Sequence, residues 1–394
     1  MTKPKISKAV WILCFVSLFT DIASEMLYPV MPVYLKSIGF SALIIGLLEG
    51  FAEATAGFSK GYFGNLSDRS GKRAPFVQFG YGLSSVSKPM LAAFVFPLWI
   101  FFARTIDRLG KGIRTSARDA ILSSESTPET KGRVFGLHRA LDTAGAFIGP
   151  VFALIFLSIY VENFRLLFLI AFIPGLLAVG FSFFIKDRKV EANPNIKGRG
   201  FFSFLKYWKI AGKDYKKLVT GLLAFALINS SDIFLLLMIK QIGYSSTEVI
   251  AAYIFYNFIY AVSSYPVGIL ADKLGLKNIF IAGLFLFALV YGGMSFQPSL
   301  VVIFILFFFY ALYASATESI SKAWITNISA KDDTATAIGF FTGFSSVFTL
   351  LASIIAGLIW STFSPPVTFA VSAIGAVLVA IYIIVVFRSE NIKA

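Results

Sequence analysis

The chain of 394 residues has little of what soluble proteins and metalloproteins rely on. Only 14% of its residues are charged, against roughly 25% in an average soluble domain. Cys14 is the single cysteine and His138 the single histidine, which excludes an intrachain disulfide and a cysteine cluster for a metal. The nucleotide-binding pattern GxxxxGK[ST] does not occur. These absences argue against a soluble protein, a metal site and an ATP-driven pump.

Apolar residues make up most of the chain instead. They account for 57% of it, and 16% of all residues are aromatic. Apolar runs of about twenty residues, enough to cross a hydrocarbon layer of ~30 Å, recur along the whole length. We therefore predict an all-α integral membrane protein with twelve spans. The predicted spans are 10–34, 41–63, 74–95, 97–120, 133–158, 165–186, 217–239, 246–270, 278–296, 299–323, 335–361 and 366–387.

Basic residues gather at the N-terminus and in alternate loops, which orients the predicted bundle. These residues are Lys3, Lys5, Lys8, Arg69, Lys72, Arg73, Lys131, Arg133, Lys273, Lys277, Lys331, Arg388 and Lys393. In membrane proteins the cytoplasmic loops carry such an excess of Lys and Arg, which is known as the positive-inside rule. The pattern predicts a bacterial cytoplasmic (inner) membrane protein with both termini in the cytoplasm. It also accounts for the net charge of +14 through topology and contact with membrane lipids, so we expect no nucleic-acid partner.

The longest polar break divides the chain. We predict an N-terminal half at 1–186, a cytoplasmic linker at 187–216 and a C-terminal half at 217–394. Within the linker, Phe204 and Trp208 alternate with lysines at helical spacing, which is typical of a helix lying on the membrane surface. The alternative is a simple extension of the seventh span.

An internal repeat relates the two halves. The segment KSIGFS at 36–41 matches KQIGYS at 240–245, and GNLSDRSGKR at 64–73 matches the segment that begins at Gly268. Both matches have an offset of 204 residues. Since six is an even number, two six-span halves enter the membrane in the same sense and are related by an axis along its normal.

The segment 64–73 resembles the signature of the major facilitator superfamily between its second and third helices, and the segment from Gly268 resembles the second copy. The matching residues are Gly64, Asp68, Arg69, Gly71, Lys72 and Arg73, followed by Gly268, Asp272 and Gly275. The resemblance implies the twelve-helix fold of that family, a monomer, alternating access and a conformational latch at these residues. Arg118 lies near the cytoplasmic end of the fourth span, which predicts either an interface with the latch or a role in transport.

Simple physics gives Asp68 a role in such a latch. A carboxylate at this position can accept hydrogen bonds from the first amides of a neighbouring helix and pair with an arginine. The glycines allow a sharp turn and close packing. A loop that only obeys the positive-inside rule would explain the basic residues, but neither the aspartate nor the glycine spacing.

Ionisable residues inside the spans are costly and seldom face lipid, so they are candidates for the substrate and proton pathway. On the fourth span the charged positions fall within an arc of roughly 120°, which predicts a polar cavity or carboxylate partners on neighbouring helices. The candidates are Asp21, Glu25, Glu49, Glu53, Arg104, Asp107, Arg108, Lys111, Arg139, Asp142, Asp232 and Glu318.

Gly145, Gly149 and Pro150 resemble the G-x-x-x-G-P motif that exporters of the superfamily carry in their fifth helix. Ala153 stands where the fuller pattern has a glycine. The resemblance implies export. The alternative is a packing role that says nothing about direction.

Together these features predict a secondary transporter, and not an enzyme, that exports a small organic molecule in exchange for protons. It needs no cofactor and no metal, because the proton gradient drives it. Buried carboxylates beside arginines suit proton coupling, since desolvation raises the pKa of a carboxylate and a neighbouring cation lowers it. The alternatives are a proton-coupled importer or uniporter of a sugar or of an anionic or zwitterionic metabolite, a lipid flippase, and a membrane sensor that does not transport.

Overall fold

A computed structural model describes residues 6–28, 30–31, 34–35, 38–40, 42–160, 163–187, 203–244 and 246–388. Within these ranges the description leaves out the side chains of residues 42–47, 49–50, 53–54, 203, 246–247 and 250. The basic residues Lys3, Lys5 and Lys393 of the topology prediction lie outside the described residues, as do the side chains of Glu49 and Glu53.

The fold is all-α. The first half contains α1 (Lys8–Glu25), α3 (Ala42–Ser70), α4 (Ala74–Ala93), α5 (Pro97–Ser124), α6 (Lys131–Ile159) and α7 (Phe164–Ser182). The second half contains α9 (Lys213–Ala226), α10 (Ile233–Ile242), α11 (Ser246–Leu274), α12 (Leu276–Met294), α13 (Leu300–Ile328), α14 (Thr334–Thr362) and α15 (Pro365–Val386). Short 3-10 turns at Pro128–Thr130 and Lys331–Asp333 lead into α6 and α14.

Local sequence sets where several of these helices begin. The Ser7 hydroxyl accepts a hydrogen bond from the Val10 amide at the start of α1, and Ser364 caps α15 in the same way through Val367. Proline occupies the first turn of α5 and α15, where its missing N–H costs nothing. Seven helices of the described residues are long and apolar enough to cross a membrane, as expected of an integral membrane protein.

Nine of the twelve predicted spans match one helix to within five residues at both ends. The other three differ. The α1 helix ends at Glu25, well before the predicted end at residue 34. The α3 helix continues to Ser70, two turns past the predicted end at residue 63, and thereby carries the signature residues up to Asp68 and Arg69 on a helix.

The seventh predicted span, 217–239, is wrong as a single helix. It consists of α9 and α10, which a break at residues 227–232 separates. The break contains Asn229, Ser230, Ser231 and Asp232, whose side chains compete with the backbone for hydrogen bonds. The Ser231 hydroxyl, for example, accepts the Ile233 amide at 3.4 Å, in place of the Asn229 carbonyl that a continuous helix would use.

The helices form two compact units that exchange two segments. Unit 1 is Met1–Glu125, Leu141–Ile210 and Ala330–Gly343, and unit 2 is Ser126–Ala140, Ala211–Ser329 and Phe344–Ala394. The first turns of α6 therefore pack with unit 2, and the first turns of α14 pack with unit 1. The predicted division at residues 187–216 remains a prediction.

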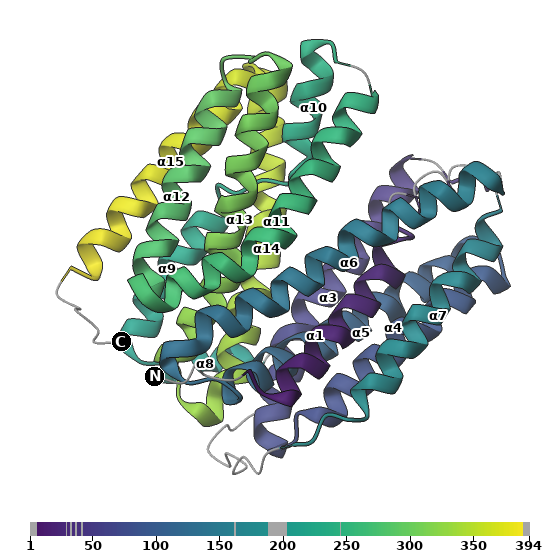
Figure 1. The fold of residues 1–394 in the computed structure, drawn as a ribbon, viewed down its shortest axis with the longest axis horizontal. Helices are drawn as coiled ribbons and strands as arrows, with labels where there is room; N and C mark the ends of the chain where they lie inside the picture. Colours follow the sequence, from purple (N-terminus) through teal and green to yellow (C-terminus); the bar gives the residue numbers. More distant parts are fainter. Residues whose placement is uncertain are drawn as a thin grey trace. The chain divides into compact units, whose positions relative to one another are not determined.

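The same packing order recurs in both units (Figure 1). In unit 1, α5 packs against α3 and α4, and α4 packs against α7. In unit 2, α13 packs against α11 and α12, and α12 packs against α15. The repeat detected in the sequence thus has a counterpart in the contacts of the helices.

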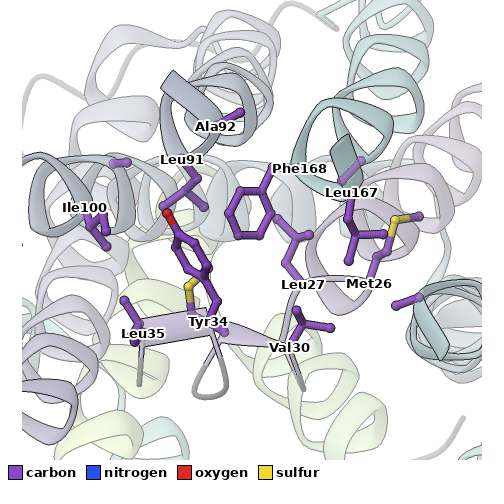
Figure 2. Packing of buried hydrophobic residues seen from close by; sticks show 14 of the residues in the cluster. Met26, Leu27, Val30, Tyr34, Leu35, Leu91, Ala92, Ile100, Leu167 and Phe168 are labelled. Atoms are coloured by element: carbon purple, nitrogen blue, oxygen red, sulfur yellow. The ribbon is translucent and has the colours of Figure 1, made fainter. Parts of the chain in front are cut away.

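Buried apolar residues form a cluster in unit 1 (Figure 2). It joins the chain after α1 to the end of α4 and the starts of α5 and α7. Tyr34 lies edge-on to Phe168, with 4.9 Å between the ring centroids, and Leu35 and Leu167 are fully buried. Close van der Waals packing of these side chains stabilises this part of unit 1.

The described part of the linker begins with a 3-10 turn at Ser203–Lys206 and α8 at Tyr207–Ile210. Phe204 is buried, and Trp208 stacks on Phe340 with 5.6 Å between the ring centroids. Burial raises the pKa of the Tyr207 hydroxyl. From Lys213 onward the segment belongs to α9, and the position of the preceding turns on the membrane surface stays a prediction.

Candidate functional site

Asp68, at the end of α3, binds the first turn of α14 within unit 1, and we call this contact the first latch. Its Oδ2 accepts the Thr336 N–H at 2.7 Å and the Thr336 hydroxyl at 2.9 Å. Its Oδ1 accepts Arg73 Nη2 at 3.0 Å, and Arg73 also donates to the Lys331 carbonyl at 3.2 Å. A buried anion at a helix N-terminus is stabilised by the unpaired amides and the helix dipole.

Asp272, at the end of α11, makes the equivalent contact within unit 2, which we call the second latch. Its Oδ1 accepts the Gly132 N–H at 2.7 Å, and its Oδ2 accepts the Arg133 N–H at 3.0 Å and Arg133 Nε at 2.8 Å. Gly132 and Thr336 are 204 residues apart, as Asp68 and Asp272 are. Both members of each contact therefore follow the internal repeat.

Glycines let the helices at both latches approach closely. A Cβ atom on Gly64 would lie 2.5 Å from the Ala335 carbonyl oxygen, and one on Gly132 would lie 2.5 Å from the Gly268 carbonyl oxygen. Gly71 and Gly275 have φ angles of +63° and +92°, which other residues rarely adopt. Lys72 is exposed and Arg69 half-buried.

Replacing Gly132 by alanine is expected to destabilise the protein by about 1–3 kcal/mol, because the added methyl group meets backbone atoms that cannot move aside. Thermal unfolding of purified protein in detergent measures the change. Gly82→Ala on α4 is the matched control, since nothing lies within 4 Å of its Cβ position and alanine favours a helix. Equal melting temperatures for the two variants would contradict the close contact.

A charge cluster connects α4 and α5 inside unit 1. The carboxylate of Asp107 lies 2.8 Å from Lys88 Nζ and 3.9 Å from Arg104 Nη1. Ser87 donates to the same carboxylate at 3.3 Å, and Lys88 also donates to the Ser24 hydroxyl of α1 at 3.1 Å. All of the charged groups are almost fully buried, so they form one interdependent network.

A second cluster in unit 1 surrounds Asp142 of α6. The Ser17 hydroxyl of α1 donates to its carboxylate, and Arg118 Nη1 of α5 lies 4.0 Å away. Arg118 also pairs with Asp119 at 3.0 Å. The charges of Asp142, Glu25 and Lys111 all act on Asp21 of α1. Arg118, which its position on the fourth span placed near the latch or in the transport path, therefore lies beside Asp119 and Asp142.

Basic side chains of α5 also interact electrostatically with the carboxylates of α1. The charges of Lys111 and Arg108 act on Glu25. Arg108 is buried and Lys111 is half-buried. Asp21 and Glu25 on α1 thus lie within electrostatic range of Lys111 on α5, and Glu25 also within that of Arg108.

The predicted pathway residues of unit 2 form a separate group. Arg139 forms an ion pair with Glu318 and donates to the Tyr260 hydroxyl. Its guanidinium also lies over the Tyr260 ring, 5.0 Å from the centroid. The Tyr310 hydroxyl donates to Asp232 Oδ1 at 2.6 Å. Further along, Tyr256 packs between Tyr260 and Tyr310.

Gly145 and Gly149 of α6 pack against α1 in unit 1. Cβ atoms at these positions would lie 2.6 Å from the Leu18 carbonyl oxygen and 2.7 Å from the Ile22 carbonyl oxygen. Pro150 lies inside α6. The motif therefore brings the backbone that carries Asp142 close to the backbone that carries Asp21.

Several contact residues were not among the predicted sites. They include Ser17, Thr336, Gly132, Arg133 and Tyr310. The offset of 204 residues could have identified Gly132 and Thr336 as a pair once Asp68 and Asp272 were paired. Nothing comparable in the sequence points to Ser17 or Tyr310, which contact carboxylates far away along the chain.

Comparison with known proteins identifies the family. The model of the Major Facilitator Superfamily matches residues 13–254 and 218–393. An uncharacterized MFS-type transporter of Methanocaldococcus jannaschii is 35% identical over 384 residues, which cover 95% of this chain and 94% of that protein. The chain belongs to the major facilitator superfamily. It is accordingly a transporter and not an enzyme, and members of this superfamily bind small-molecule substrates.

Solved structures of superfamily members share the fold. The crystal structure of a human organic anion transporter has a TM-score of 0.80 at 14% identity and covers 97% of this chain and 100% of its own. The fucose:proton symporter of E. coli has a TM-score of 0.75 at 13% identity, with 97% and 98% covered. The twelve-helix superfamily fold is thus confirmed, with α9 and α10 together forming the seventh helix.

Proposed function

We propose that this superfamily member is a proton-coupled antiporter that exports a small organic molecule, and that it lies in a cytoplasmic membrane with both termini inside. The observation that carries the proposal is the Asp142 cluster of unit 1. There a carboxylate lies within hydrogen-bonding distance of Ser17, 4.0 Å from Arg118 and within the electrostatic reach of Asp21. Binding or loss of a proton at such a carboxylate changes which side chains it pairs with.

The cluster supports a specific cycle. With Asp142 ionised, its charge is balanced by Arg118; with Asp142 protonated, Arg118 retains Asp119 at 3.0 Å and the attraction between α5 and α6 weakens. Because Gly145 and Gly149 bring α6 directly against α1, a small change at Asp142 reaches both helices. Through this contact between α6 and α1, proton binding at Asp142 would favour one conformation of the transporter over another. A proton-coupled relative in fold, the fucose symporter, supports this driving force.

Export is supported by the fifth-helix motif, and import remains the second candidate. The basic side chains of α5, which include Arg104, Arg108 and Lys111, suit an anionic or zwitterionic substrate. The human neighbour in fold is described as an organic anion transporter. The direction of proton movement separates the two candidates.

The test uses proteoliposomes with an imposed pH gradient and a fluorescent pH reporter. Compounds from a panel of metabolites and drugs are added one at a time. A transported compound is expected to make protons cross the membrane in the direction opposite to its own movement. Asp142→Asn is expected to abolish the proton signal, because the amide cannot ionise. Asp214→Asn, at an exposed position at the start of α9, is the matched control and is expected to behave as the wild type.

Two results would overturn the proposal. One is the absence of proton movement with every compound of the panel, although the protein binds some of them. The other is an unchanged proton signal in Asp142→Asn. Proton and substrate movement in the same direction would establish the importer in place of the exporter.

A further inference from the structure

The break between α9 and α10 leaves oxygen atoms without the partners that a continuous helix would provide. The Ser230 amide bonds to the Ile228 carbonyl, and the Ser231 amide bonds to the Ser353 hydroxyl at 3.1 Å. The Ile233 amide bonds to the Ser231 hydroxyl. In a continuous helix these amides would bond to the carbonyls of Ala226, Leu227 and Asn229. Those three carbonyls therefore lose their usual donors.

Side-chain oxygens are also buried at the break. Asn229 Oδ1 is buried and has no hydrogen-bond partner among the described residues; Ser230 Oγ and the Tyr291 hydroxyl are buried beside each other. Ser230 is 3% exposed and Tyr291 1% exposed. The Tyr291 hydroxyl of α12 lies close to Ser230 and within the electrostatic reach of Asp232. Leaving several polar atoms unpaired inside a membrane protein costs free energy for each of them.

Asp232 adds a negative charge at the same place. Its Oδ1 accepts the Tyr310 hydroxyl at 2.6 Å. The break therefore combines one carboxylate with an amide oxygen, hydroxyl oxygens and released backbone carbonyls. This composition is rich in acceptors and suits a cation better than it suits an anion.

The chemistry of the site restricts the cation. Among the described residues no group of three or more His, Cys, Asp or Glu side chains could hold a metal ion, which disfavours transition metals and a high-charge calcium site. The neighbouring rings are packed closely, with centroid distances of 5.0 Å for Tyr256 and Tyr310 and 3.9 Å for Phe287 and Tyr291. That packing fits a single small ion better than an organic ammonium group.

We propose that the α9–α10 break binds a sodium ion, held by Asp232 together with the neutral oxygens of Asn229, Ser230 and the interrupted backbone. Unwound segments of transporter helices supply carbonyl oxygens of this kind to Na⁺. The site is independent of the Asp142 cluster in unit 1 and goes beyond the proposed proton coupling.

The experiment measures thermal unfolding of the purified full-length protein in detergent, without substrate or pH gradient. NaCl is titrated against choline chloride at constant ionic strength, and KCl is tested in parallel. The expected result is a saturable rise of several degrees in melting temperature with Na⁺, none with choline and less with K⁺, because an ion that binds only the folded state stabilises it.

Variants locate the ion. Asp232→Asn is expected to abolish the response to Na⁺, and Asn229→Ala is expected to raise the midpoint concentration of Na⁺ by about tenfold or more. Asp214→Asn, the matched substitution at the exposed start of α9, is expected to respond as the wild type does. If Asp232→Asn fails to fold, the response of Asn229→Ala and Tyr291→Phe to Na⁺ decides the question. A smaller rise in melting temperature than in the wild type supports the site.

Identical melting curves in all three salts, or a wild-type response in both Asp232→Asn and Asn229→Ala, would overturn the sodium site and leave ordered water as the partner of these oxygens. Since no proton gradient is used, this result has no bearing on the Asp142 test. A sodium response in a protein that shows no proton movement would conversely support the site and reject the proposed coupling.

Discussion

Asp107→Asn is expected to lower the free energy of unfolding by about 3–5 kcal/mol, which is typical when one member of a buried ion pair is removed. Asp107 is 6% exposed and Lys88 2% exposed. Without the carboxylate, Lys88 keeps its hydrogen bond to Ser24 but remains a buried cation beside Arg104. Thermal or chemical unfolding in detergent measures the loss.

A double-mutant cycle distinguishes a specific pair from general damage to the core. Lys88→Met combined with Asp107→Asn removes both charges and is expected to be more stable than Asp107→Asn alone, because the methionine needs no counter-charge. Asp214→Asn is the control for an exposed pair, whose loss should be hardly measurable. Purely additive effects of the two single substitutions would show that Lys88 and Asp107 do not stabilise each other.

Asp68→Asn is expected to open the first turn of α14 and to abolish most transport. The Asp68 carboxylate accepts hydrogen bonds from the Thr336 amide, the Thr336 hydroxyl and Arg73, and bonds to a charged group contribute about 1.5–3 kcal/mol each. Losing even one of them should accelerate amide hydrogen exchange at the start of α14 by at least about tenfold, since ~1.4 kcal/mol corresponds to that factor. Hydrogen exchange with mass spectrometry reads this out without a known substrate.

Graded variants test the mechanism of the latch. Thr336→Val removes the hydroxyl bond but keeps the amide bond, so it should have a smaller effect than Asp68→Asn. Asp332→Asn changes an exposed carboxylate in the adjacent turn and should leave exchange unchanged. If Asp68→Asn and Asp332→Asn showed the same exchange, Asp68 would not be what holds α14.

Much of the fold follows from patterns that need no tertiary information. Span positions depend on hydrophobic run length, which the lipid layer imposes directly, and nine helices match their predictions closely. One of the three exceptions, at α9 and α10, has a local cause. Four consecutive polar residues at 229–232 interrupt backbone hydrogen bonding, but hydropathy averaged over a span conceals them.

The candidate site was less accessible to sequence reasoning. Helical spacing placed Arg104, Asp107 and Arg108 on one face of α5, yet it could not show that Lys88 of α4 would bind Asp107 or that Arg118 would lie beside Asp142. Such partners are separated by 19 to 24 residues, and which ones meet depends on how helices cross and on which glycines allow close approach.

The sequence by itself determined the membrane class, the internal duplication, the family and the positions of both latch aspartates, because composition, run length and an exact offset are properties of the chain alone. Only the tertiary structure decided which helix each aspartate binds, which arginine neutralises which carboxylate and where the seventh helix breaks. These outcomes depend on side chains and amides brought together from distant segments, and each buried polar atom takes whichever partner the packed helices place within reach.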